Sequence, residues 1–230
     1  MKKIFILEIS ILIFVLFSVL ETKSQLFECP DNCAEYEFTY RPDIPGCNHH
    51  LGPDDIVYVK YCCCFDASGP GYTATVTEYN WPNCSFRNCV FSDTIRRNLF
   101  LKQLIDSLRK DVFTREPGCL SDIPPCDDPG MVPVRVSIRL AKCWKEVNFW
   151  SYRWNEWILA SVRCPNTTAE CDKWYQVCRD FQTMRLRILA EGCNMIGNDN
   201  CSFEIPIIPP PGKTETEPWE TECYALPCCP

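Results

Sequence analysis

Two stretches of the chain alternate apolar and polar side chains with the period of two that a half-buried strand requires. In the first, Val57 and Val59 alternate with Tyr58 and Lys60, and residues 134–144 repeat this pattern. The turn-forming sequence Ser-Gly-Pro-Gly follows the first stretch, and the Thr- and Tyr-rich residues 72–79 suit a returning strand. These patterns predict a β-hairpin in each half of the chain.

Downstream of the first hairpin, the apolar positions change to the spacing of an amphipathic helix. Asp93 is suited to cap its start, and Pro117 followed by Gly118 ends it. The predicted apolar face consists of Leu101, Leu104, Ile105, Leu108 and Val112.

A second helix is predicted after the second hairpin. Thr167 and Glu170 have the spacing of a capping box, and Gly192 suits the position just after a helix. Its predicted apolar face consists of Trp174, Val177, Cys178, Phe181, Met184 and Ile188.

The chain also resembles itself at a shift of about 80 residues. The sequence Asp-Ile-Pro-Gly-Cys at 43–47 recurs as Asp-Ile-Pro-Pro-Cys at 122–126, and the same shift carries Cys64 onto Cys143. A third copy begins at Cys201 and breaks off. The repeat predicts an α+β fold of two tandem disulfide-stapled modules, each a β-hairpin or small antiparallel sheet packed on one α-helix.

Domain boundaries follow from this repeat and from the ends of the chain. Residues 1–24 are predicted to be a signal peptide, because two lysines precede an apolar run and small residues precede Gln25. The alternative is an uncleaved membrane anchor, for which the uninterrupted apolar run is short. Cysteine-rich modules are predicted at 25–111 and 112–201, followed by a Pro-rich acidic tail at 202–230 that is a candidate truncated third repeat.

All 19 cysteines follow the predicted signal peptide. Secreted proteins use cysteines at this density as disulfides, and the irregular spacing lacks the recurring short pairs of zinc sites, so no metal and no cofactor are expected. The favoured pairings are Cys47 with Cys84 or Cys89, Cys64 with a cysteine after the first helix such as Cys119, Cys126 with Cys164 or Cys171, and Cys143 with Cys193 or Cys201.

Two groups of cysteines contain members that these pairings do not include. Cys62, Cys63 and Cys64 are consecutive, so they are expected to serve different bridges, either between modules or to the N-terminal Cys29 and Cys33. Because the cysteine count is odd, at least one thiol is free or bonded to another molecule. The predicted candidates for an intermolecular bond, and for self-association through the tail, are Cys223, Cys228 and Cys229.

Charge and residue types narrow the function classes. The net charge of -7, without a basic stripe, argues against nucleic acid as a partner. The two histidines, His49 and His50, are adjacent in a loop, and no serine-nucleophile or phosphate-loop motif is present. An enzyme is therefore the less favoured class, with a small secreted hydrolase as the remaining catalytic alternative.

The strongest candidate for recognition is a row of aromatic residues with period two. Trp150, Tyr152 and Trp154 form this row, and Arg153 and Glu156 are placed to supply polar edges. An exposed row would suit a sugar or another protein, whereas a buried one would fill a core. The sequence predicts a secreted or cell-surface interaction protein with a protein or glycan partner outside the cytosol and no membrane span after signal cleavage, with a carbohydrate- or ligand-binding module as the alternative.

Overall fold

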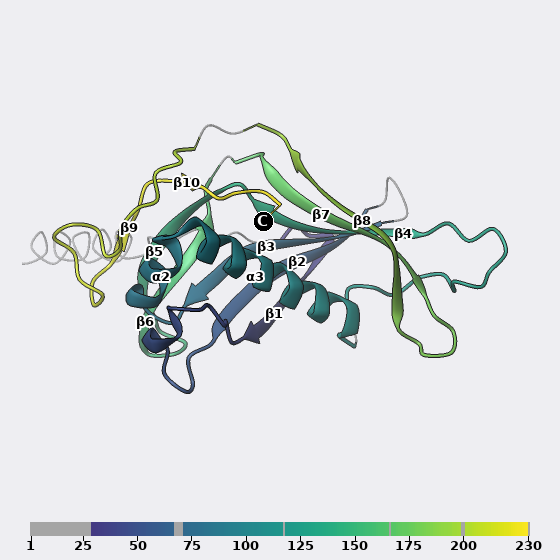
Figure 1. Cartoon of the computed structure of the whole chain (residues 1–230), viewed down its shortest axis with the longest axis horizontal. Helices are drawn as coiled ribbons and strands as arrows, with labels where there is room; N and C mark the ends of the chain where they lie inside the picture. Colours follow the sequence, from purple (N-terminus) through teal and green to yellow (C-terminus); the bar gives the residue numbers. More distant parts are fainter. Residues whose placement is uncertain (1–28, 67–70, 117, 166, 199–200, 230) are drawn as a thin grey trace, which may run out of the picture.

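The computed structural model describes residues 29–66, 71–116, 118–165, 167–198 and 201–229. Within these residues the chain forms one mixed β-sheet of ten strands, two α-helices and a short 3-10 helix (Figure 1). The strands are β1 (Cys33–Tyr40), β2 (Val57–Asp66), β3 (Gly71–Trp81), β4 (Val134–Ala141), β5 (Cys143–Ser151), β6 (Glu156–Arg163), β7 (Glu170–Arg179), β8 (Leu186–Ile196), β9 (Trp219–Glu220) and β10 (Tyr224–Ala225). The helices are η1 (Asn48–His50), α2 (Cys84–Phe91) and α3 (Thr94–Thr114).

Strand β3 organises the sheet, because it pairs with three other strands. One edge of β3 pairs with β2, which in turn pairs with β1. The other edge is shared: residues 71–76 run parallel to β4, and residues 78–81 run antiparallel to β6. The sheet therefore forks beside β3, and one branch continues through β4, β7 and β8 while the other continues through β6 to β5, β9 and β10.

Helices α2 and α3 form the crossover between the parallel strands β3 and β4, and they lie on one face of the sheet, which we call the core face (Figure 1). The Asp93 side chain caps α3 by accepting hydrogen bonds from the backbone N–H groups of Ile95 and Arg96. The helix then buries against the sheet the apolar side chains Phe100, Leu101, Leu104, Leu108 and Val112. The first predicted helix and its cap are thus confirmed.

The predicted fold of two modules, each a hairpin packed on one helix, is wrong. The molecule is mostly β-sheet, and the second predicted helix is absent because its residues form the antiparallel strands β7 and β8. The sheet also runs from the first predicted module into the second, since β3 pairs directly with β4 and β6. The shift of 79 residues carries α3 onto residues 173–193, which form parts of β7 and β8 and the turn between them, so this part of the sequence repeat is not a structural repeat. The predicted signal peptide lies outside the described residues.

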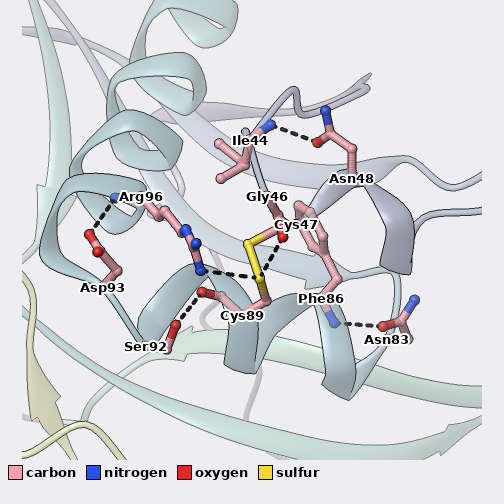
Figure 2. The surroundings of a disulfide bond; sticks show 10 residues. All are labelled: Ile44, Gly46, Cys47, Asn48, Asn83, Phe86, Cys89, Ser92, Asp93 and Arg96. Carbon is pink, nitrogen blue, oxygen red and sulfur yellow. Dashed lines mark hydrogen bonds between the residues drawn. A yellow bond between two sulfur atoms is a disulfide. The ribbon is translucent and has the colours of Figure 1, made fainter.

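Nine disulfides join the described residues. They are Cys29–Cys62, Cys33–Cys64, Cys47–Cys89, Cys63–Cys119, Cys126–Cys178, Cys143–Cys201, Cys164–Cys223, Cys171–Cys228 and Cys193–Cys229. The Cys47–Cys89 bond ties the loop before η1 to α2, beside the capping residues Asn83 and Asp93 (Figure 2).

Several of the predicted pairings differ from this set. Cys64 bonds to the N-terminal Cys33, and Cys63 is the residue that reaches Cys119 after α3, because position 63 lies on the core face. Cys126 bonds to Cys178 instead of Cys164 or Cys171, since the strand β7 places its end beside Cys126.

The free thiol also differs from the one predicted. Cys84 was expected in a disulfide, but among the described residues it is the free cysteine, and it is buried. The tail cysteines are the predicted candidates for a bond to another molecule, yet all three are bonded within the chain, because β9 and β10 dock the tail against β5 and bring the cysteines to the sheet.

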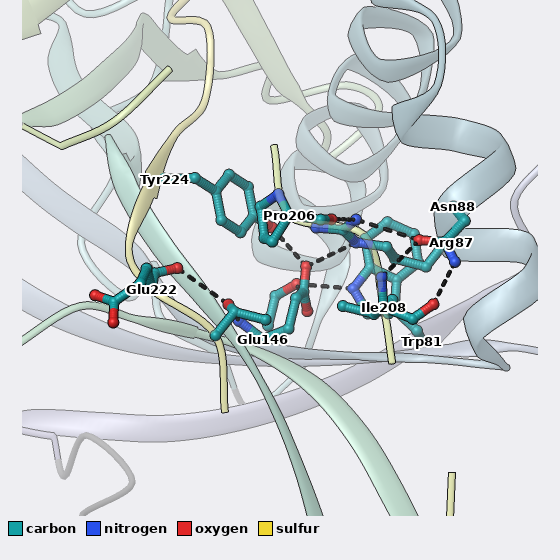
Figure 3. A network of polar contacts seen from close by, with 10 residues as sticks. Trp81, Arg87, Asn88, Glu146, Pro206, Ile208, Glu222 and Tyr224 are labelled. Atoms are coloured by element: carbon teal, nitrogen blue, oxygen red, sulfur yellow. Dashed lines mark hydrogen bonds and ion pairs between the residues drawn. The ribbon is translucent and has the colours of Figure 1, made fainter. Parts of the chain in front are cut away.

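A buried ion pair also fixes the tail (Figure 3). The Glu146 carboxylate of β5 lies 3.0 Å from Nε of Arg87 in α2, and both side chains are almost fully buried. The same carboxylate accepts hydrogen bonds from the Tyr224 hydroxyl in β10 and the Ser161 hydroxyl in β6. Arg87 also donates to the carbonyl of Pro206 in the tail. One carboxylate therefore connects the sheet, a helix and the C-terminal segment.

Candidate functional site

The β5–β6 hairpin carries the predicted aromatic row, but the row does not form one platform. Trp150 and Trp157 face each other across the two strands, with ring centroids 5.8 Å apart. The residues between the strands form a turn in which Asn155 adopts a left-handed conformation with φ of 55°. The turn interrupts the strand alternation, so Trp154 does not continue the line of Trp150, and Tyr152 is 92% exposed.

Trp154 instead packs on the face of the sheet opposite the helices, which we call the outer face. Its ring lies 5.7 Å from the ring of Tyr58 in β2, and the Arg153 guanidinium lies over it at 5.4 Å. The same Arg153 lies 3.9 Å from a carboxylate oxygen of Glu37 in β1. Trp154 is 36% exposed and Tyr58 is 43% exposed, so both rings present part of their surface to solvent.

The alternation along β2 explains why Tyr58 is on this face. Its neighbours Val57 and Val59 are completely buried in the core, so Tyr58 and Lys60 project from the other side. In the pairing of β2 with β3, Tyr58 is opposite Asn80 and Lys60 is opposite Glu78. The strands thus assemble an aromatic ring, an amine, a carboxyl group and an amide side by side on the outer face.

A narrow cleft opens beneath Trp154. It is lined by Tyr58, Lys60, Glu78, Asn80 and Trp154, together with Glu37 and Val59, and its volume of about 10 Å³ matches a single water molecule. Asn80 is only 7% exposed, and its Oδ1 atom has no hydrogen-bond partner among the described residues. A buried amide oxygen costs free energy when it is unpaired, so this atom is a ready acceptor for a water molecule or for a ligand hydroxyl.

The electrostatics of the cleft are mixed. Burial raises the pKa of Glu78, the nearby Lys60 ammonium lowers it, and the Glu37 and Glu35 carboxylates raise it further. Lys60 also lies 3.7 Å from Glu37. The exposed rings are therefore bordered by acceptors from Asn80 and the glutamates and by donors from Lys60 and Arg153.

The structure places the predicted site residues in different surroundings. Trp154 and Arg153 belong to the cluster around the cleft, whereas Trp150 packs against Trp157 and Tyr152 extends into solvent. Glu156 is exposed at the start of β6, opposite Ser151. The predicted set lacks Tyr58, Lys60, Glu78 and Asn80, whose only signal in the sequence is that Tyr58 and Lys60 are on the polar side of an alternating strand.

No protein-family model, curated protein sequence or solved structure matches this chain. The nine disulfides indicate an oxidising, extracellular environment. None of the helices in the described ranges is long and apolar enough to cross a membrane. In the same ranges, no three His, Cys, Asp or Glu side chains are grouped so as to hold a metal ion.

Proposed function

We propose that this chain is an extracellular, disulfide-stabilised protein that binds carbohydrate through Trp154 and Tyr58. A sugar ring has an apolar C–H face that packs on an aromatic side chain, and its hydroxyl groups need both donors and acceptors. The partly exposed rings of Trp154 and Tyr58 supply the apolar surface. The surrounding polar groups supply both kinds of hydrogen-bonding partner.

The observation that carries this proposal is the unpartnered Asn80 oxygen beside the two exposed rings. The cleft is too small for a sugar ring, so the ligand rests on the outer surfaces of the rings. One hydroxyl group, or a water molecule that it binds, then reaches Asn80. Lys60 and Arg153 donate hydrogen bonds to ligand oxygens at the rim.

The hairpin offers a matched pair of variants for testing this site. Trp150 and Trp154 are nearly equally exposed, at 37% and 36%, but they lie in different surroundings. On a glycan array, the wild-type chain is expected to bind a subset of sugars, and Trp154→Ala is expected to weaken that binding at least about tenfold, which is 1.4 kcal/mol. Trp150→Ala is expected to bind as the wild type does.

Circular dichroism and thermal unfolding establish that both variants fold. The proposal fails if the wild-type chain binds no glycan, or if Trp150→Ala abolishes binding while Trp154→Ala retains it. Retained binding in both variants would place the sugar elsewhere on the molecule.

A further inference from the structure

A large groove lies on the core-face side of the molecule, remote in the chain from the aromatic cluster. It has a volume of about 1070 Å³ and runs between the second half of α3 and the β7–β8 turn. Its apolar lining includes Phe113 of α3 and Met184, Leu186 and Ile188 of the β7–β8 hairpin. Met184 and Ile188 are exposed large hydrophobic side chains, so the groove presents apolar surface to solvent.

The walls of the groove are basic, in contrast to the acidic chain as a whole. Five cationic side chains and three acidic ones line it, a local balance of 5 - 3 = +2 against a net charge of -7 for the whole chain. Three cations are exposed and have no acidic partner in the described part of the chain: Arg41, which donates to the backbone carbonyls of Gly52 and Pro53, Lys110 on the helix wall and Arg185 on the hairpin wall. An occupant is therefore expected to combine apolar groups with negative charge.

The groove has the length of a short peptide. The lining residues of α3 run from Gln103 to Thr114, and 11 helical steps of about 1.5 Å span about 16 Å. An extended chain of about five residues covers the same distance. An open groove of this length accommodates a loop or strand.

This chain itself carries a segment with the required negative charge. Residues 213–222, the acidic loop, contain four glutamates and one lysine, a balance of -3. Residues 211–216 are exposed throughout, and Lys213 lies 3.7 Å from Glu217 inside the loop, so the loop as a whole keeps its excess of negative charge. Figure 1 places this yellow loop at one end of the long axis, whereas the β7–β8 turn and the end of α3 lie toward the other end.

We propose that the groove binds the acidic loop of a second copy of this chain. The loop and groove of one molecule are at opposite ends, so the contact is heterologous and joins molecules head to tail. Each added copy leaves one free loop and one free groove, so assembly continues beyond the dimer. The assembly is non-covalent, since the tail cysteines are bonded within the chain.

Sedimentation velocity of the purified chain tests the proposal. The sedimentation coefficient is expected to rise with protein concentration at low salt and to fall toward that of the monomer at about 1 M salt, where the screening length is about 3 Å. The double variants Lys110→Ala/Arg185→Ala and Glu215→Gln/Glu217→Gln are each expected to remain monomeric. An equimolar mixture of these two variants is expected to form dimers and nothing larger, because each pair has only one intact loop facing one intact groove.

Two single variants serve as matched controls. Arg187→Ala removes an exposed cation two residues from Arg185 that does not line the groove, and Glu204→Gln removes an exposed tail carboxylate outside the loop. Both are expected to assemble as the wild type does. A wild-type chain that stays monomeric at all concentrations would overturn the proposal, and so would a mixture of the two double variants without dimers.

Discussion

At the level of single residues, the outer face contains a carboxyl group in an unfavourable place. Glu78 is only 6% exposed, and burial raises its pKa more than the Lys60 ammonium lowers it. The carboxylates of Glu37 and Glu35 add to the rise. The site thus retains a group that opposes folding when it is charged, which is common where a binding function constrains the residue type.

Replacing Glu78 with Gln is expected to stabilise the protein at neutral pH. The folded state holds the proton more tightly than the unfolded state, so the wild type loses stability as the pH rises through the window that begins at the ordinary glutamate pKa of 4.5. Below that window the carboxyl group is protonated in both states, and the advantage of Glu78→Gln disappears. Urea unfolding at about pH 4 and about pH 7 measures this difference.

The control for this prediction is Glu156→Gln, which changes an exposed glutamate of the neighbouring hairpin. Its free energy of unfolding should follow that of the wild type at both pH values. A variant Glu78→Gln that is less stable than the wild type at neutral pH would show that the Glu78 charge is compensated in the folded protein.

At the level of elements, α2 and the tail depend on one buried carboxylate. Glu146 accepts hydrogen bonds from Arg87, Tyr224 and Ser161, which come from three different elements. The Arg87 guanidinium also lies 4.4 Å from the centre of the Phe91 ring. Breaking a buried pair from one side leaves an uncompensated charge that no water can reach.

We expect Glu146→Gln to lower the free energy of unfolding by about 3–5 kcal/mol, because Arg87 then stays buried without its counter-ion. The adjacent residue in β5 offers a matched control, since Lys145 pairs with Glu220 of the tail at 2.6 Å but Glu220 is 65% exposed. Glu220→Gln is expected to cost at most about 1 kcal/mol. Equal losses in the two variants, measured by urea unfolding, would contradict the special role of the buried pair.

The sequence predicts some of these elements and conceals others. The spacing of Leu101, Leu104 and Leu108 is sufficient to locate α3, because one face of that helix is buried along its length. The strands β7 and β8 are concealed by a bulge beside Gln176 and Val177, which breaks the alternation that would identify them. Trp174, Val177 and Cys178 consequently acquire the spacing of a helix.

A buried aspartate in β7 also makes this strand difficult to predict from the sequence. Asp172 is completely buried although aspartate is usually exposed, because Arg135 and Arg139 of the neighbouring strand approach it.

The candidate site is also not predictable from the order of residues along the chain. Asn80 and Glu78 are brought to Tyr58 and Trp154 by pairing between strands distant in sequence, and a linear pattern does not specify that pairing.

At the level of the whole molecule, both the single sheet and the disulfides stabilise the fold. The core face carries a continuous apolar cluster that extends from β1 to β10, and a smaller cluster of Val147, Ile158 and Ala160 lies apart from it. Four disulfides join residues after position 200 to β5, β7, β8 and the segment after β6. The tail is therefore an integral part of the fold and closes the branch of the sheet that ends at β5.

Removing one of these tail bonds should weaken the fold without abolishing it. In the double variant Cys164→Ser/Cys223→Ser, a closed loop with a sequence separation of 59 is released in the unfolded state, and the free energy of unfolding is expected to fall by about 2–4 kcal/mol. Cys84→Ser is the matched control, because Cys84 forms no disulfide and burial, with the nearby Glu215 carboxylate, raises the pKa of its thiol to about 12. That substitution removes no cross-link, and the serine hydroxyl can donate to Glu215 as the thiol does, so it is expected to cost about 1 kcal/mol. Non-reducing urea unfolding compares the two, and a loss in Cys84→Ser as large as that in the double variant would contradict the prediction that the cross-link contributes more to stability than the buried thiol does.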